Sequence, residues 1–188
     1  MRKFALTATL IFSLGLLAFY PNTYNLNTDG NKFVGVKACV MCHKSEKQGE
    51  QQKIWENSDH ANSYKSLLTA EADELAKAAG LETKAVESEM CLKCHATAYN
   101  VDQALLDKKF KIEDGIQCES CHGAGSNYKK MKTMKDHAAS VAAGMTEYKS
   151  DEDIEKQCKT CHNPESPTYK EFVFAEKWAK IAHPVPAK

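Results

Sequence analysis

The stretch GIQCESCHGAGS, residues 115–126, contains two cysteines separated by two residues and followed at once by a histidine. A C-x-x-C pair alone suits a disulfide, half of a zinc site or a redox pair. The pattern with the histidine, C-x-x-C-H, occurs four times in the 188 residues. The four copies are CVMCH at 39–43, CLKCH at 91–95, CESCH at 118–122 and CKTCH at 158–162.

These copies use all eight cysteines and four of the seven histidines. C-x-x-C-H marks the attachment of c-type haem, because two thiols bond to the vinyl groups of one porphyrin and the next imidazole binds the iron from the proximal side. The sequence therefore predicts four covalently bound haem c groups, each with its iron. The attaching thiols would be Cys39, Cys42, Cys91, Cys94, Cys118, Cys121, Cys158 and Cys161, and the proximal ligands His43, His95, His122 and His162.

Other uses of the cysteines explain less of the pattern. Four disulfides would suit an exported chain but leave the histidines without a role. Two zinc sites of four cysteines each would need no histidine after every pair.

Three histidines remain: His60, His137 and His183. Each lies on or beside an apolar helical face, where a buried, hydrogen-bonded histidine is the ordinary interpretation. Four irons, however, need sixth ligands, and imidazole is a common protein ligand of haem iron. We predict that these three are distal ligands. Seven histidines cannot fill eight axial positions, so at least one iron is five-coordinate or binds water, Met, Lys or another ligand.

The N-terminus predicts export. Arg2 and Lys3 precede an uncharged run that ends at Tyr20, so residues 1–20 are expected to be a cleaved signal peptide or a retained N-terminal membrane anchor. Residues 21–32 read as a polar linker, and residues 33–188 as one tetrahaem cytochrome c domain. We expect a periplasmic or otherwise exported protein, with anchoring to the inner membrane as the alternative.

The equal numbers of basic and acidic residues argue against nucleic acid as a partner. Lysine plus arginine equals aspartate plus glutamate, 25 each, which gives no basic footprint for nucleic acid. The expected partners are redox proteins that donate and accept electrons, and the N-terminal segment offers contact with a membrane.

The segments between the motifs read as short helices or loops. Within residues 45–68, His60 shares a helical face with two apolar side chains, and residues 70–79 form a helix that Gly80 stops. Residues 127–145 place one apolar stripe along a helix, Ser150 and Asp153 form a capping pair, and Pro184 ends a C-terminal helix. With no alternating strands, the fold class is mainly α: a multihaem cytochrome c with short helices and loops wrapped around four closely packed haems.

Several stretches resemble the cytochrome c-554 family of tetrahaem electron-transfer proteins. They are FVGVKACVMCH, WENSDHANSY, CLKCHATAY, GIQCESCHGAGSNY and CHNPESPTYKEF. The resemblance implies a helical fold with stacked haem pairs, three bis-histidine haems and an open second haem on His95. It also implies that His60 serves the third haem, His137 the first and His183 the fourth, and that the protein passes electrons between periplasmic partners.

We expect an electron carrier rather than an enzyme, and predict no catalytic residue. Three alternatives stay open: a membrane-anchored quinol dehydrogenase of the NapC/NirT type, a reductase of NO, nitrite or hydroxylamine at the open haem, and a polymerising filament. Lys44 and the two residues after it stand where the quinol dehydrogenases favour a methionine, which weakens the first alternative.

Overall fold

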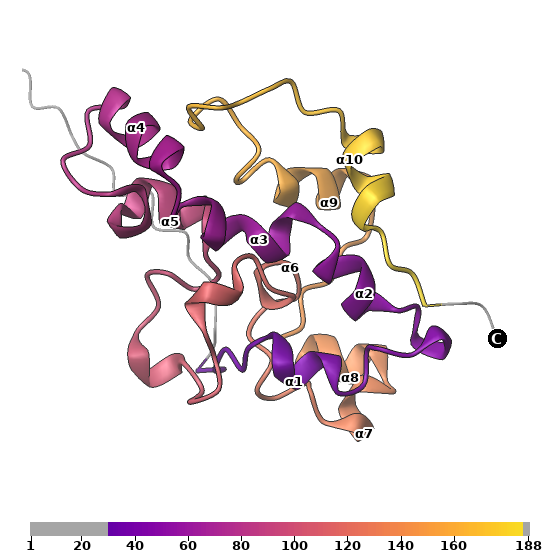
Figure 1. Ribbon diagram of the computed structural model, residues 1–188. Helices are drawn as coiled ribbons and strands as arrows, with labels where there is room; N and C mark the ends of the chain where they lie inside the picture. Colours follow the sequence, from indigo (N-terminus) through magenta and orange to yellow (C-terminus); the bar gives the residue numbers. More distant parts are fainter. Residues whose placement is uncertain (1–29, 186–188) are drawn as a thin grey trace, which may run out of the picture.

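The computed structural model describes residues 30–185 of the chain (Figure 1). Short helices follow one another with long loops between them, and residues 30–185 contain no strand, only an isolated bridge between Phe33 and Leu106. The prediction of a mainly α fold is therefore confirmed. The α-helices are α1 Val36–Val40, α2 Gln51–Glu56, α3 Asp59–Ser66, α4 Ala70–Ala78, α5 Glu89–His95, α6 Glu119–His122, α7 Met131–Met134, α8 His137–Ala142, α9 Asp151–Cys158 and α10 Phe174–Ile181. Single 3₁₀ turns are η1 Glu46–Gln48, η2 Ala85–Glu87, η3 Gln103–Leu105 and η4 Ile112–Asp114.

The helix ends follow the local sequence signals. The Thr69 side chain accepts a hydrogen bond from the Ala72 N–H at the start of α4, and that helix ends just before Gly80. Ser150 caps α9 by accepting from the Asp153 N–H, as its capping pattern predicts. Each cap satisfies a backbone donor that the first turn of a helix leaves unpaired.

One helical segment differs from its expectation. Residues 127–145 were expected to carry one continuous stripe, but they form two helices, α7 and α8. The break comes at Asp136, whose carboxylate accepts from the Ala139 N–H and so starts a new helix. A side chain that bonds to nearby backbone competes with helix continuation, which is the physical reason for the break.

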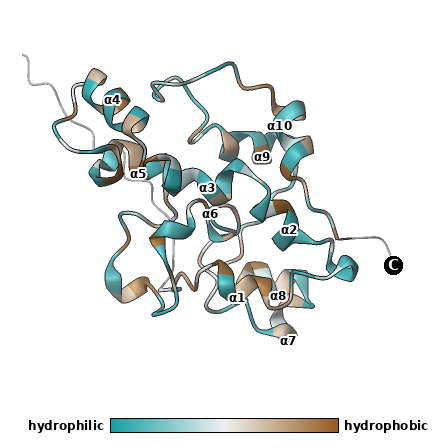
Figure 2. Cartoon of the chain, viewed as in Figure 1, coloured by the Kyte–Doolittle hydropathy of each residue, from teal (hydrophilic) through white to brown (hydrophobic). Residues whose placement is uncertain are grey.

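Few apolar side chains are buried. One cluster contains Phe33, Ala98 and Ala124, and a second contains Leu67, Ala76 and Ala85. Hydrophilic residues occur on every labelled helix (Figure 2). Within residues 30–185 no helix has the length and apolar character needed to cross a membrane. The predicted signal or anchor and most of the polar linker lie outside the described residues.

Candidate functional site

The four C-x-x-C-H motifs all lie in helical or turn backbone. The His43 N–H donates to the Cys39 carbonyl at 3.1 Å, and the third and fourth motifs repeat this bond at 2.9 and 3.0 Å. The second motif lies inside α5. In such backbone, residues three and four apart share one face, so both thiols and the imidazole of a motif point to the same side. That arrangement fits one covalently attached haem per motif.

Thiols of different motifs also meet. Cys39 of the first motif is hydrogen-bonded to Cys118 of the third, which raises the pKa of the Cys39 thiol and lowers that of Cys118. Cys94 of the second motif makes the same kind of bond with Cys161 of the fourth, which lowers the pKa of Cys161 to about 7. The first motif therefore lies against the third, and the second against the fourth.

The third and fourth motifs adjoin as well. Burial, followed by the neighbouring Cys158, raises the pKa of the Cys121 thiol to about 12. The Gln157 side chain donates to the Ser120 carbonyl at 3.1 Å, and the Tyr148 hydroxyl donates to the Cys121 carbonyl at 2.7 Å. These contacts connect the second motif to the fourth, the fourth to the third and the third to the first. Thr97, two residues after the second motif, also hydrogen-bonds to Ser120 of the third.

Two pairs of histidine rings lie next to each other, one pair tilted and the other edge-on. The ring centroids are 6.1 Å apart for His60 and His162, and 6.0 Å apart for His122 and His183. Two imidazoles that bind one iron from opposite faces have centroids about 6 Å apart, because each metal–nitrogen bond is about 2 Å and each centroid lies about 1 Å behind its nitrogen. The residues present therefore fit a haem iron with two axial imidazoles at both places.

This pairing differs from the one that the resemblance implied. His60, on α3, lies beside the proximal histidine of the fourth motif rather than the third, and His183 lies beside that of the third rather than the fourth. The spacing of the histidines along the chain does not predict which of them become neighbours in the fold. Of the two helices concerned, α3 carries His60 and packs against η4, and α10 precedes His183 and packs against α2.

The surroundings of these rings favour neutral imidazoles. Burial, followed by the charges of His183 and His43, lowers the pKa of His122 to about 4. Burial also lowers the pKa of His60, with His162 as the next cause. A neutral imidazole has a free nitrogen lone pair, which is the form that binds a metal.

Two histidines are oriented by their Nδ1 atoms. The Nδ1–H of His95 donates to the Ser63 carbonyl at 2.8 Å, and that of His183 donates to the Ile181 carbonyl at 2.7 Å. A carbonyl only accepts, so each Nδ1 holds the proton and each Nε2 is left for the iron.

The structure does not bring His137 against another histidine ring within residues 30–185. Its side chain is 68% exposed, with Nδ1 3.9 Å from the Glu147 carboxylate. His137 begins α8, in the segment that is packed against the third motif: Gly123 closely approaches the Gly144 carbonyl at the end of that helix.

Residues 115–126, which contain the third motif, also contact the chain next to the other three motifs. The wholly buried Glu119 carboxylate accepts from the N–H groups of Val34, Gly35 and Gly125, at 2.7–3.1 Å. Beside it, Gln117 accepts from the Val36 N–H at 2.7 Å and donates to the Lys111 carbonyl at 2.8 Å. These bonds fix the chain entering the first motif onto the third.

The same stretch also holds α2, α3 and the residues after the second motif. The Trp55 indole N–H donates to the Ile116 carbonyl at 2.7 Å, and the Ile116 N–H donates to the His60 carbonyl at 3.0 Å. The Gln117 N–H donates to the Thr97 hydroxyl at 2.8 Å. Sequence reasoning missed the roles of Gln117 and Glu119, although an acidic residue inside an attachment motif, flanked by glycines, is a visible signal.

Aromatic side chains pack beside the third and fourth motifs. Phe172 stacks on His162 with centroids 5.0 Å apart, and the buried Tyr128 donates to the Gly123 carbonyl at 2.6 Å. Burial raises the pKa of Tyr128 and of Tyr148, so both hydroxyls keep their protons as donors.

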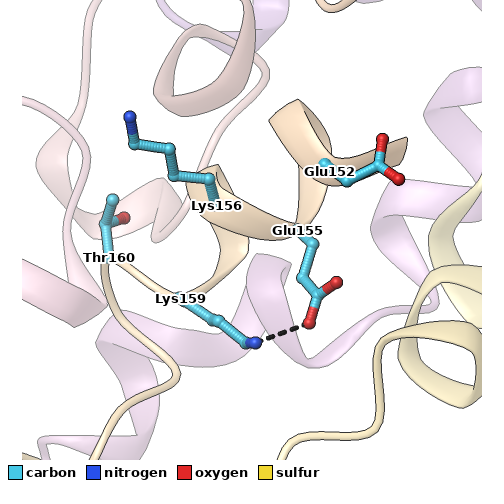
Figure 3. A pocket seen from close by; sticks show the side chains of 5 residues that line it. All are labelled: Glu152, Glu155, Lys156, Lys159 and Thr160. Atoms are coloured by element: carbon cyan, nitrogen blue, oxygen red, sulfur yellow. Dashed lines mark ion pairs between the residues drawn. The ribbon is translucent and has the colours of Figure 1, made fainter. Parts of the chain in front are cut away.

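A surface depression of about 380 Å³ lies on α9 and the turn after it (Figure 3). Its lining is charged and includes the ion pair between Lys159 and Glu155 at 2.6 Å. Its lining contains no histidine or cysteine, but Lys159 and Thr160 are the two residues between the cysteines of the fourth motif.

Comparison with known proteins gives two similarities. Residues 38–123 match the family described as cytochrome c554 and c-prime. The chain is also 26% identical over 139 residues to cytochrome c-554 of Nitrosomonas europaea, an alignment that covers 69% of this chain and 57% of that relative. The chain thus spans little more than half the length of the curated relative that it matches. No solved structure matches the chain.

Proposed function

We propose, on the premise that this chain resembles the cytochrome c-554 family, that it is an exported tetrahaem c-type cytochrome that transfers electrons between redox proteins. A c-type cytochrome binds haem covalently, and the four C-x-x-C-H motifs offer four attachment sites. Each bound haem supplies an iron that takes up and releases one electron.

The observation that carries this proposal is that the four motifs adjoin one another in the fold. Thiols of the second and fourth, the fourth and third, and the third and first motifs contact or influence one another. Haems attached to those thiols would lie close together, which is what a relay requires. The ion pair of Lys93 with Glu165 joins the second motif to the loop after the fourth and keeps that junction closed.

The histidines support a specific ligand set. His60 would be the sixth ligand of the fourth haem and His183 that of the third, each opposite the ring that it faces at about 6 Å. His137 remains for the first haem, and the second haem, on His95, would lack a histidine as its sixth ligand. In this set the protein keeps the rings neutral by burial and orients His95 and His183 through their Nδ1 atoms.

The first experiment counts haems and their spin states. Mass spectrometry of the purified protein is expected to show four covalent haems. Electron paramagnetic resonance of the oxidised protein is expected to give three low-spin haems and one high-spin haem, with CO binding to one reduced haem. Fewer than four haems would overturn the proposal, whereas four low-spin haems without CO binding would contradict only the open second site.

Localisation is proposed from the N-terminal sequence. A cleaved signal would leave the cytochrome in the soluble periplasmic fraction, whereas a retained anchor would leave it with the inner membrane. Fractionation together with N-terminal sequencing of the mature protein distinguishes these outcomes. Membrane retention with quinol-dependent reduction would favour the quinol dehydrogenase instead.

A further inference from the structure

A compact positive surface lies beside the first motif. Residues 129–135, KKMKTMK, contain four lysines and no acidic residue. They lead into and form α7, and all four lysines are exposed. We call this set, Lys129, Lys130, Lys132 and Lys135, the lysine surface.

The lysine surface forms no ion pair within residues 30–185, although Lys129 offsets part of the rise that burial causes in the pKa of Glu119, and Asp136 directly follows Lys135. The ion pairs within residues 30–185 involve Lys53, Lys93, Lys149, Lys159 and His137, and none of the four lysines of the surface. Exposed charges act over about 10 Å at moderate salt, so four lysines this close together, against the single buried Glu119 and the adjacent Asp136, create a positive local potential.

Glu119 fixes the lysine surface next to the first motif. Its carboxylate accepts from the N–H of Gly125 on one side and from those of Val34 and Gly35 on the other. The Lys129 N–H donates to the Gly125 carbonyl at 3.0 Å, while Gly35 immediately precedes α1, which carries Cys39. Consistent with this closeness, the Cys118 hydrogen bond raises the pKa of Cys39 and the Lys129 ammonium offsets part of that rise.

The first motif is also the one most open to solvent. Cys42 is exposed, whereas the other seven cysteines are half-buried, and the adjacent Met41 is 72% exposed. In the contacts described above the first motif adjoins the third, so a haem attached there would lie at the edge of the group. A solvent-exposed haem at the edge of the group would be the one that another protein can approach closely enough to exchange electrons.

The segment that leads into the second motif, which we call the acidic end, has the opposite charge. Residues 70–90, which include α4 and lead into the second motif, contain six acidic residues and two lysines. In Figure 1, α4 and α7 lie at opposite ends of the molecule. The formal charges balance over the whole chain, so the two ends differ by local arrangement and not by an excess of one sign.

We propose that the lysine surface docks an acidic redox protein for electron exchange with the first haem, an inference that rests on the proposed tetrahaem function. Complementary charge accelerates encounter and sets orientation more than it adds affinity. The positive end would therefore select the partner by its negative surface.

The test uses two small oxidants of opposite charge with the intact holoprotein. In each reaction one ferrous haem loses one electron, and either hexacyanoferrate(III) becomes hexacyanoferrate(II) or tris(phenanthroline)cobalt(III) becomes the cobalt(II) complex. We compare the wild type with Lys130→Glu/Lys132→Glu. The matched control, Lys77→Glu/Lys84→Glu, makes the same change in net charge at two exposed lysines of the acidic end.

At low ionic strength the Lys130→Glu/Lys132→Glu variant is expected to react about tenfold more slowly with hexacyanoferrate(III) and faster with the cobalt complex. The control variant is expected to change little, and salt should remove the difference. Equal effects in both variants would mean that net charge alone matters and would overturn the docking surface. A wild type that reacts faster with the cationic cobalt complex than with hexacyanoferrate(III) would overturn it as well. The negative haem propionates would then dominate the electrostatic potential around the first haem.

Two further measurements keep the outcomes separate. Lys130→Gln/Lys132→Gln removes the charges without adding acids, and is expected to give an intermediate rate. Covalent haem content is measured for every variant. A wild type without four haems would refute the proposed function, whereas intact haems with no site-dependent change in rate would refute only the docking surface.

Discussion

Glu119 shows how one residue determines local structure in this protein. It lies inside an attachment motif, where the residue type does not matter for haem attachment, yet its carboxylate is wholly buried. Burying a carboxylate is unfavourable unless donors surround it, and three backbone N–H groups do so here. Burial nevertheless raises the pKa of Glu119, with the hydrogen bonds acting in the opposite direction.

Replacement of Glu119 with Gln is expected to lower the free energy of unfolding by about 2–3 kcal/mol. The amide has only one accepting oxygen, so its NH₂ group must face a backbone donor. Denaturant unfolding of the holoprotein measures the loss. Glu113→Gln, the same change at an exposed carboxylate of the same segment, is the control and should have an effect within about 0.5 kcal/mol of zero. Equal stability of the two variants would refute the proposed role.

Gly115→Ala is expected to destabilise the protein by about 1–3 kcal/mol more than Gly80→Ala. Both glycines have positive φ, 72° and 79°. A Cβ at Gly115 would come within 2.6 Å of the His60 carbonyl, whereas a Cβ at Gly80 meets nothing within 4 Å. Thermal unfolding measures the difference. Because the clash displaces His60, the Gly115→Ala spectrum should also gain a high-spin signal, which the Gly80→Ala spectrum should lack.

At the scale of elements, the helices position ligands more than they build a core. The described α-helices are at most nine residues long, and α3 and α10 each carry or precede a histidine that we propose as a distal ligand. Isolated helices this short are marginal in water, so packing and cofactor binding must hold them. Side-chain caps such as Ser150 and Asp136 define where such short helices begin.

The pairing of α3 with the fourth motif predicts a dependence between two variants. His60→Ala alone should make one additional haem high-spin without loss of covalent haem. In a background that lacks the fourth attachment site, Cys158→Ala/Cys161→Ala, His60→Ala should add no high-spin haem, because its iron is already gone.

His183→Ala is the control, since it should add a high-spin haem in both backgrounds. Electron paramagnetic resonance with mass spectrometry provides the count. The opposite dependence would restore the pairing that the family resemblance implied.

At the scale of the whole molecule, the described residues bury few apolar side chains. The two buried clusters contain mainly alanines, with Phe33 and Leu67 as their large members. A core of this size provides little hydrophobic stabilisation for a chain of this length. The four haems are expected to supply the rest, as metals do in small metal-dependent domains.

A chain produced without haem attachment is therefore expected to lose most of its helix. Circular dichroism of a variant with all eight cysteines changed to alanine would be compared with that of the holoprotein. Far-ultraviolet helix signal reduced by more than about half, with no cooperative thermal transition, is the expected result. A cooperative transition in the variant would show that the polypeptide core suffices.

The sequence by itself predicted the chemistry of the site. Haem attachment needs two thiols and an imidazole within five consecutive residues, so a local pattern specifies it completely. Local signals also predicted α4, the Ser150 cap and the mainly helical fold, because caps and glycine stops act within a few residues. The stretch 127–145 was predicted less well, since the Asp136 cap competes with the apolar stripe that crosses it.

Only the tertiary structure decided which distant residues meet. The pairing of His60 with His162, and of His122 with His183, joins residues separated by many turns of chain, and no spacing rule fixes such a contact. The arrangement of the motifs in space and the burial of Glu119 depend likewise on loop paths. Those paths are set by long-range hydrogen bonds such as that from Trp55 to Ile116, which a one-dimensional pattern does not record.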